Sequence, residues 1–385
     1  MVDINALLKI VRECNASDLH LKTGTHPIIR INGELRPLTD LPRLSPMDTQ
    51  SLTDQLVSSY QKKSLENDLD IDLAYEFPNL GRFRVSIFHQ RGTLALALRF
   101  IPLKIRNIRE LLLPPVLENI ALEERGLVLV TGTTGTGKST TLAGMIDHIN
   151  VNRRKNIITI EDPIEYLHSD KMSVISQREV GADVKGFSRG LRSALREDPD
   201  VILVGEMRDL DTIETAILAA ETGHLVMSTL HTLDARETIN RIISVFPPYH
   251  QRQIRIQLAG ILKSIISMRL IPKKDRTGRV PAVEVMINTP YIEECIMAKE
   301  KTSLIRDAIA AGVSQYGMQS FDQSIYFLYK HDFISFEQGL KYSSSPDNFK
   351  LRVSGVQSTL DIALHEMEEK LGLYEPEEKD NAEEE

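Results

Sequence analysis

The sequence predicts an α/β protein with a small α+β amino-terminal domain, a parallel α/β core and a helical carboxyl-terminal part. The chain has 385 residues, more than one average domain requires. Strand and helix patterns mix in its first hundred residues, whereas short apolar runs alternate with amphipathic patterns from about residue 111. The predicted parts are residues 1–101 (amino-terminal domain), 102–110 (linker), 111–290 (core), 291–370 (helical part) and 371–385 (disordered acidic tail).

The amino-terminal domain opens with a predicted helix, because apolar residues recur there at i, i+3, i+4 and i+7. A hairpin follows at 27–35, where Asn-Gly is a tight-turn signal. Residues 81–88 and 93–99 have the pattern of two paired strands, and Pro102 begins the linker. The apolar face of the first helix consists of Ile4, Leu7, Leu8 and Val11.

The core is predicted from short, continuous apolar runs, which are typical of strands covered on both faces. Amphipathic helical patterns separate these runs, so a parallel sheet is expected. Beyond Pro247 the chain reads as mainly helical, with one hairpin. The predicted strands are 127–130, 157–160, 201–204 and 225–227; the predicted later helices are 251–268, 292–299, 304–311 and 319–329, with the hairpin at 269–285.

Composition indicates an ordinary water-soluble protein, with 42% apolar and 26% charged residues. No apolar run approaches the ~20 residues of a membrane helix, and no signal peptide is evident, so we expect a cytoplasmic protein. The two cysteines, Cys14 and Cys295, offer neither a disulfide framework nor metal spacing. The net charge of −8 argues against general nucleic-acid binding, and no nucleic-acid partner is expected.

A phosphate-binding loop of the form G-x-x-x-x-G-K-[ST] lies between the strand at 127–130 and an amphipathic helix. Its glycines let the backbone turn tightly and present N–H groups to phosphate oxygens. Lys138 can reach the β- and γ-phosphates, and the Ser139 hydroxyl can bind Mg²⁺. The loop therefore predicts a nucleoside triphosphate site. Its predicted binding residues are Gly132, Thr133, Thr134, Gly135, Thr136, Gly137, Lys138, Ser139 and Thr140.

Two acidic clusters follow predicted strands, at the sheet edge where ligands bind in open α/β folds. The first contains Glu161 and Glu165, and the second ends in Glu206, where many phosphate-loop enzymes have an aspartate. Hydrolysis requires carboxylates that hold Mg²⁺ and orient water. We predict that Glu206 polarises water or completes the Mg²⁺ shell, with Glu165 sharing the task.

Two histidines, His224 and His231, flank the strand at 225–227 and would lie at its opposite ends, so a shared metal ion is not expected. His231 emerges at the edge of the acidic clusters and is a candidate sensor of the γ-phosphate. A lone histidine at a strand end is usually structural, and this interpretation stays open for both residues.

Arginines gather in the strands of the amino-terminal domain, where Arg82, Arg84, Arg91 and Arg99 lie close in sequence. On an isolated domain they would be solvated, but a guanidinium can also stabilise the charge that develops in phosphoryl transfer. In the second interpretation, this domain or the same domain of a neighbouring subunit closes over the triphosphate. Three further arginines at 189, 192 and 196 form a stripe on a predicted helix, either solvated or at a subunit contact.

Several of these segments together resemble the secretion ATPase superfamily, and within it the type IV pilus retraction ATPases of the PilT/PilU type. The similarity covers nearly the whole chain apart from the tail. It rests on residues 16–21 and 81–85, the phosphate loop at 131–141, an Asp-box-like segment at 160–165, a Walker-B-like segment at 195–209 and a His-box-like segment at 223–232.

The resemblance implies a homohexameric ATPase whose subunits pair a PAS-like amino-terminal domain with a RecA-like domain. ATP would lie between the domains, with Lys138 and Ser139 on phosphate and Mg²⁺ and with Ser139 and Glu206 as the metal ligands. Domain rotation would act on an inner-membrane platform protein, at the cytoplasmic face of that membrane, and a paralogous retraction ATPase is a further partner. The catalytic group so implied is Glu206, Glu165, Glu161, Arg84, Arg99, His231 and His224.

The sequence leaves alternative functions open within and outside this family. Extension and type II secretion relatives usually carry a four-cysteine zinc module, which two cysteines cannot build. Retraction motors have a second basic residue in a carboxyl-terminal motif, whereas this chain keeps Arg306 and has Ala310. An accessory PilU-like motor and a nucleotide-gated adaptor therefore stay open beside the principal motor.

Overall fold

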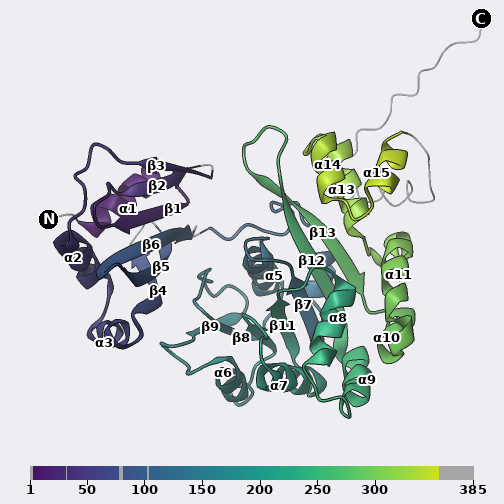
Figure 1. The fold of residues 1–385 in the computed structure, drawn as a ribbon. Helices are drawn as coiled ribbons and strands as arrows, with labels where there is room; N and C mark the ends of the chain where they lie inside the picture. Colours follow the sequence, from purple (N-terminus) through teal and green to yellow (C-terminus); the bar gives the residue numbers. More distant parts are fainter. Residues whose placement is uncertain (1–2, 32, 78–80, 102–103, 355–385) are drawn as a thin grey trace, which may run out of the picture. The chain divides into compact units, whose positions relative to one another are not determined.

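The computed structural model describes residues 3–31, 33–77, 81–101 and 104–354, and Figure 1 shows the course of the chain. The chain forms two compact units. Unit 1 comprises residues 1–105, 160–169 and 177–186, and unit 2 comprises the rest. The predicted acidic tail at 371–385 and the predicted linker proline Pro102 lie outside the described residues, as does Asn32 of the predicted turn.

Unit 1 contains a six-stranded antiparallel sheet with the order β3-β2-β1-β6-β5-β4. Three helices accompany it, and the apolar faces of sheet and helices form one core. Its strands are β1 (Asp18–Lys22), β2 (Ile28–Ile31), β3 (Glu34–Pro37), β4 (Asp70–Phe77), β5 (Gly81–Gln90) and β6 (Thr93–Ile101), and its helices are α1 (Ile4–Glu13), α2 (Pro46–Leu56) and α3 (Ser59–Asp68).

The predicted elements of the amino-terminal domain are confirmed. The buried residues of α1 are the four that its periodicity predicts. Strands β2 and β3 form the first hairpin, and β5 and β6 form the second, in which Gln90 pairs with Thr93. The two residues of that turn, Arg91 and Gly92, have φ of 51° and 75°, as a tight two-residue hairpin loop requires.

Unit 2 is built on a seven-stranded sheet with the order β13-β12-β7-β11-β10-β8-β9, although the last residues of β8 (160–161) and β9 (177–179) belong to unit 1. The central strands β12, β7, β11 and β10 run parallel, and β13 pairs antiparallel with β12. Each of the four predicted core strands is confirmed. The strands are β7 (Gly126–Thr131), β8 (Asn156–Glu161), β9 (Val174–Glu179), β10 (Val201–Val204), β11 (Leu225–Leu230), β12 (Leu262–Pro272) and β13 (Arg279–Ile287).

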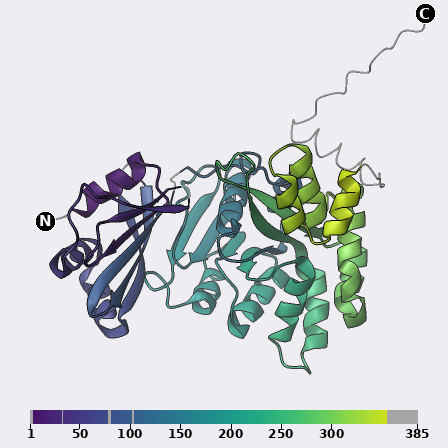
Figure 2. The same ribbon diagram turned by 45° about the horizontal axis from the view of Figure 1, so that its top comes forward.

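Helices surround this sheet, and those after β13 gather beside its β13 edge, as Figures 1 and 2 show together. A second apolar cluster joins β12 and β13 to α13–α15. The helices are α4 (Val116–Ala121), α5 (Lys138–Asn152), α6 (Phe187–Ala194), α7 (Leu210–Glu221), α8 (Ala235–Ser244), α9 (Gln251–Ile261), α10 (Pro290–Met297), the 3₁₀ helix η1 (Lys299–Leu304), α11 (Ile305–Ala311), α12 (Val313–Tyr316), α13 (Phe321–Lys330), α14 (Phe336–Tyr342) and α15 (Pro346–Val353).

The predicted helix at 251–268 is wrong beyond Ile261, where α9 ends and β12 begins. Most of β12 is buried, and it pairs with β7 on one side and β13 on the other. An apolar run buried on both faces has the same pattern in a strand as in a buried helix, so periodicity does not separate them. The missed signal is the β-branched pair Ile265-Ile266, which favours a strand.

Candidate nucleotide site

The phosphate loop joins the end of β7 to the start of α5 through a backbone that only glycine adopts readily. Gly132, Gly135 and Gly137 have φ of 143°, 79° and 96°. A Cβ atom on Gly132 would lie 2.6 Å from both the Met268 carbonyl oxygen and the Thr136 hydroxyl. The loop therefore packs directly against β12. The backbone N–H groups in the first turn of a helix such as α5 have no acceptor within the helix and can bind an anion.

Lys138 is drawn into this loop and is only 8% exposed. Its ammonium group donates to the carbonyl oxygens of Gly132, at 2.9 Å, and Thr133, at 3.0 Å. The Thr136 hydroxyl closes the same turn by donating to the Thr133 carbonyl at 2.8 Å. The loop is thus pre-formed around one cationic group, with Ser139 and Thr140 in the first turn of α5.

Glu206 follows β10 and lies between two basic side chains. Its carboxylate accepts from Arg208 Nη2 at 2.8 Å and lies 3.2 Å from His231 Nε2. Burial by itself raises the pKa of Glu206, but the hydrogen bond from Arg208 and the charges of His231 and Arg208 outweigh it. The net effect lowers the pKa of Glu206 below its ordinary value, so this carboxylate is charged at neutral pH.

Three of the predicted site segments meet at one edge of the unit 2 sheet. Strand β11 lies between β7 and β10 and runs parallel to both, so the phosphate loop, Glu206 and His231 all follow the carboxyl ends of adjacent strands. His224 precedes β11 and lies at the opposite edge, where its Nδ1 is 2.9 Å from the Ala219 carbonyl oxygen. The structure does not bring His224 together with the other three within one subunit.

A groove of about 360 Å³ opens beside the phosphate loop within unit 2. Three segments distant in sequence line it: the chain before α4, the start of α5 and the β12–β13 hairpin. Sequence reasoning missed this groove, because no motif connects these segments. Its lining includes Arg106, Glu110, Thr140, Met268, Leu270 and Arg279.

The predicted residues of unit 1 take part in ion pairs and hydrogen bonds within that unit. Arg84 lies 3.3 Å from Asp72 and 3.9 Å from Glu165, so two predicted site residues are neighbours. Arg99 donates to the nearly buried Asp18 at 2.9 Å. Glu161 accepts from the Gln177 side chain at 3.2 Å.

Among the described arginines of unit 1 that form ion pairs, Arg82 is the most buried, and its Nη2 donates to Glu179 at 2.9 Å. Sequence reasoning did not single out Glu179. The same Glu179 oxygen accepts from the backbone N–H of Ile164, so it fixes the segment after Glu161 to the strand of Arg82.

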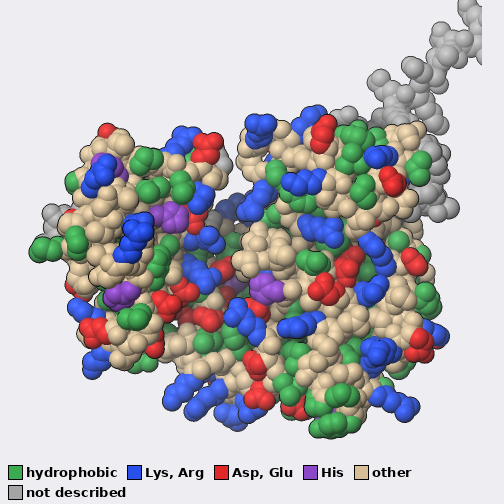
Figure 3. Space-filling model, viewed as in Figure 1, with side chains coloured by type: hydrophobic (Ala, Val, Ile, Leu, Met, Phe, Trp, Pro, Cys, Tyr) green, Lys and Arg blue, Asp and Glu red, His purple; other side chains and the backbone are tan. Residues whose placement is uncertain are grey.

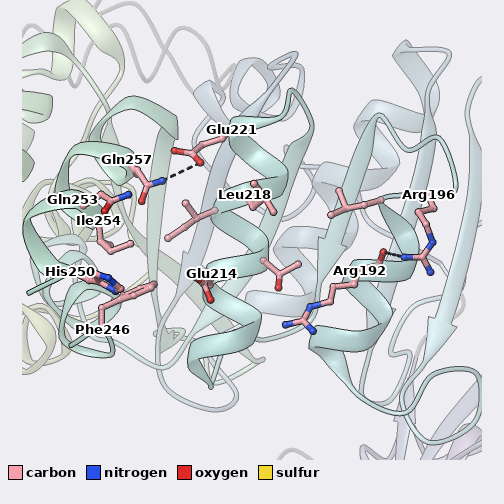
Figure 4. Close-up of a pocket in the computed structure, with 13 residues that line it drawn as sticks. Arg192, Arg196, Glu214, Leu218, Glu221, Phe246, His250, Gln253, Ile254 and Gln257 are labelled. Carbon is pink, nitrogen blue, oxygen red and sulfur yellow. Dashed lines mark hydrogen bonds between the residues drawn. The ribbon is translucent and has the colours of Figure 1, made fainter.

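A second groove, of about 630 Å³, lies among α6, α7 and α9, and none of the predicted nucleotide residues lines it (Figure 4). Arg192 and Arg196 extend along its α6 side, and Gln257 donates to Glu221 at 3.2 Å across its α7–α9 side. Basic and acidic side chains are interspersed over the face of unit 2 shown in Figure 3. Two arginines of the predicted stripe, Arg192 and Arg196, therefore border a groove of mixed charge.

Metal binding by protein groups alone has no support in the described part of the chain, where no three His, Cys, Asp or Glu residues form a suitable cluster. A magnesium ion commonly takes one or two protein ligands and completes its shell with phosphate and water. The donors at this site, one hydroxyl and one carboxylate, fit that arrangement.

Among the described helices, none is both long and apolar enough to cross a bilayer.

Comparison with known proteins identifies the family. The family described as "Type II/IV secretion system protein" matches residues 3–320. The chain belongs to this family. It is 45% identical to the type IV pilus retraction ATPase PilT of Pseudomonas aeruginosa over 348 residues, which are 90% of this chain and 100% of the relative. It is 38% identical to the type IV pilus ATPase PilU of the same organism, over 94% of each chain.

Solved structures of the family confirm the predicted fold, a PAS-like α+β domain followed by a RecA-like ATPase domain. The crystal structure of the pilus retraction motor PilT with bound ADP matches with a TM-score of 0.83, covering 90% of this chain and 99% of that one. The ATPase DotB of Legionella pneumophila, at 28% identity, matches with a TM-score of 0.74 over 92% of this chain and 95% of that one. The resemblance to retraction ATPases predicted from the motifs is also confirmed.

Proposed function

We propose that this chain hydrolyses ATP and uses the free energy to retract type IV pili in twitching motility. The observation that carries the proposal is 45% identity to a pilus retraction ATPase over all of that relative, with the same fold. A twitching motility protein of Neisseria gonorrhoeae is 41% identical over 84% of this chain and 85% of the relative. Both similarities point to the retraction branch of the family.

In this proposal the phosphate loop holds the triphosphate of ATP. Lys138 exchanges its loop carbonyl contacts for phosphate oxygens, and backbone N–H groups at the start of α5 bind the remaining charge. Ser139 and Glu206 would hold Mg²⁺ together with phosphate and water, and the ion would supply positive charge that neutralises charge developing on the phosphate. The groove beside the loop accepts the base and ribose, because the half-buried Leu112 and Leu270 offer apolar surface beside polar Arg106 and Glu110.

Glu206 is proposed as the residue that orients the attacking water. Its charged carboxylate can accept a proton, while Arg208 and His231 restrict its orientation. His231 then registers whether the γ-phosphate is present. Glu165 and Glu161 are proposed to assist, and His224 is proposed to report nucleotide state from the other end of β11.

The amino-terminal arginines are proposed to complete the site in a homohexamer. Arg84 and Arg99 carry positive charge on the unit 1 sheet, and Arg99 is held by a single hydrogen bond to Asp18 with 67% of its side chain exposed. An arginine with this freedom can move to a phosphate. The proposed partners are an inner-membrane platform protein, contacted from the cytoplasm, and a paralogous retraction ATPase.

Steady-state ATP hydrolysis by the purified full-length protein tests the chemistry. We expect Lys138→Ala to abolish turnover and nucleotide binding, and Glu206→Gln to reduce kcat by about 10²-fold or more while ATP still binds. Glu214→Gln, which removes an exposed carboxylate of α7, is the control and should retain full activity. Normal turnover by Glu206→Gln would contradict the assignment, and negligible turnover by the unmodified protein would favour a nucleotide-gated adaptor.

A strain lacking this chain tests the direction of action. We expect excess surface pili without twitching motility, since pili would extend and not retract. Cells without pili would instead indicate an extension or secretion ATPase. Complementation with Lys138→Ala should fail, whereas complementation with Glu214→Gln should restore motility.

An accessory, PilU-like motor is the second candidate, and one observation favours it. The chain has Ala310 where retraction motors have a second basic residue. The 38% identity to PilU over 94% of both chains is compatible with it. Continued pilus retraction in the deletion strain would support this candidate over a principal motor.

A further inference from the structure

Unit 2 contains a buried carboxyl group that the proposed chemistry does not use. Glu284 lies in the middle of β13, between apolar neighbours, and is 4% exposed. Its Oε1 accepts the backbone N–H of Ala235, the first residue of α8, at 2.9 Å. A carboxyl group so far from water is strongly unfavourable unless polar neighbours satisfy it.

On one side, Glu284 belongs to a polar row that crosses three strands. Ser267 of β12 is opposite Glu284 in the antiparallel register and opposite Thr131 of β7 in the parallel register. Side chains at paired positions share a face of the sheet. The Thr131 hydroxyl donates to the Ser267 hydroxyl at 3.0 Å, and both are fully buried. Thr131 is the residue directly before the phosphate loop.

On the other side, Glu284 holds the helix that follows His231. Asp234 is the N-cap of α8 and accepts the N–H of Glu237 at 2.7 Å. The hydroxyls of Thr232 and Thr238 are 2.6 Å apart, so the 231–234 loop is tied to α8. The loop begins at His231, whose side chain contacts Glu206.

We propose that Glu284 is a positioning residue that couples the phosphate loop to the His231 loop. The connection runs from the phosphate loop through Thr131 and Ser267 to Glu284, and from Glu284 through the start of α8 to His231 and Glu206. This inference rests on the proposed ATPase function. It assigns to Glu284, which is outside the proposed nucleotide-binding residues, the task of keeping the phosphate loop and the His231 loop in one arrangement.

The neutral form of Glu284 suits this task better than the ionised form. A neutral carboxyl group accepts from Ala235 and has an O–H that can donate, whereas a carboxylate accepts more strongly from Ala235 but cannot donate and repels Asp234. The charged groups that face it are Asp234 before α8, Arg269 on β12 and Arg306 on α11, and Asp322 of α13 faces Arg269. Burial is the main cause that raises the pKa of Glu284 to about 7, so both forms occur near neutral pH.

The test compares the pH dependence of ATP turnover in the full-length protein and in Glu284→Gln, which keeps an acceptor and a donor but does not ionise. We expect the ratio of kcat, variant to unmodified protein, to rise up to about tenfold from pH 6 to pH 8, with KM for ATP unchanged. A purely structural role would change kcat equally at all pH values, and such a constant ratio overturns the proposal. Glu214→Gln is the matched control.

A double-mutant cycle tests the path. In a Ser267→Ala background, Glu284→Gln should change the pH profile much less than it does alone, and an undiminished change would show that coupling does not pass through Ser267.

Hydrogen exchange gives a readout that needs no turnover. After correction for intrinsic exchange rates, amides 235–238 of the unmodified protein should exchange faster at pH 8 than at pH 6. In Glu284→Gln the two rates should be the same. Equal rates at pH 6 and pH 8 in the unmodified protein would overturn the proposal. Absent turnover with this exchange pattern would reject the ATPase function and keep the positioning role.

Discussion

Two opposite influences act on Glu206, and their balance sets when this residue can act as a base. Burial raises its pKa, whereas the hydrogen bond from Arg208 and the charges of His231 and Arg208 lower it. The lowering influences prevail, so Glu206 stays ionised at pH values where an isolated buried carboxyl group would bind a proton. The motif predicts the position of Glu206, but Arg208 and its orientation toward Glu206 come only from the structure.

Arg208→Gln should therefore move the acid limb of the kcat profile to higher pH. Without the guanidinium, burial dominates and the pKa of Glu206 rises. Turnover measured from pH 5 to pH 9 checks this expectation. Arg189→Gln, which removes an exposed arginine of α6, is the control and should leave the profile in place. A profile that does not shift in Arg208→Gln would contradict this account of Glu206.

Glu284 makes stability itself depend on pH. Its folded pKa of about 7 lies above the ordinary 4.5, so between these values the folded state binds a proton that the unfolded state has released. Stability is therefore lost as pH rises from 4.5 to 7 and changes no further above 7. The full difference corresponds to about 3 kcal/mol.

Glu284→Gln removes this titration. We expect its Tm, relative to that of the unmodified protein, to increase from pH 5 to about pH 7 and then to level off. Calorimetry of both proteins in matched buffers measures the difference. A Tm difference that is constant across this range would contradict the buried, neutral state of Glu284.

At the scale of elements, β12 and the phosphate loop depend on each other. Met268 of β12 approaches Gly132 so closely that a single added carbon would overlap its carbonyl oxygen. The glycine pattern of the loop is readable from sequence, because each glycine has a fixed place in the motif. The partner strand is not readable, because its apolar run fits a helix equally well and only pairing with β7 decides between them.

Gly132→Ala should disrupt the loop for two reasons. The backbone has a positive φ that alanine adopts poorly, and the added Cβ would overlap the Met268 carbonyl oxygen. We expect a loss of about 1–3 kcal/mol in unfolding free energy and of most nucleotide affinity, measured by denaturant unfolding and by titration with ADP. Gly260→Ala in α9 is the matched control, since a Cβ there meets nothing within 4 Å and the backbone is helical. The control should be neutral or slightly stabilising.

At the scale of the whole molecule, the chain forms two units with separate apolar cores. The periodicity of α1 and the alternation in β5 predict the first core, because each element has one buried face. The groove beside the phosphate loop was not predictable, since its lining comes from three separate segments between residues 106 and 281. Such juxtapositions depend on sheet order, which single-sequence patterns do not encode.

Leu8→Ala tests the independence of the first core. Leu8 is completely buried in α1, so its truncation should reduce the stability of unit 1 by about 2–5 kcal/mol. Leu35→Ala in β3, where the side chain is 53% exposed, should change it by less than about 0.5 kcal/mol. Limited proteolysis of the full-length chain should show earlier cleavage within residues 1–105 for Leu8→Ala only.

The ion pair between Arg82 and Glu179 has a consequence for any attempt to divide the protein. Glu179 is reached only after the chain has passed through the phosphate loop and α5, yet it belongs to unit 1 and meets Arg82 there. A fragment that stops at residue 105 would leave a largely buried guanidinium without this counter-ion and would lack the segments at 160–169 and 177–186. The amino-terminal unit therefore cannot be cut out at residue 105 without loss, because two of its segments are encoded after the phosphate loop.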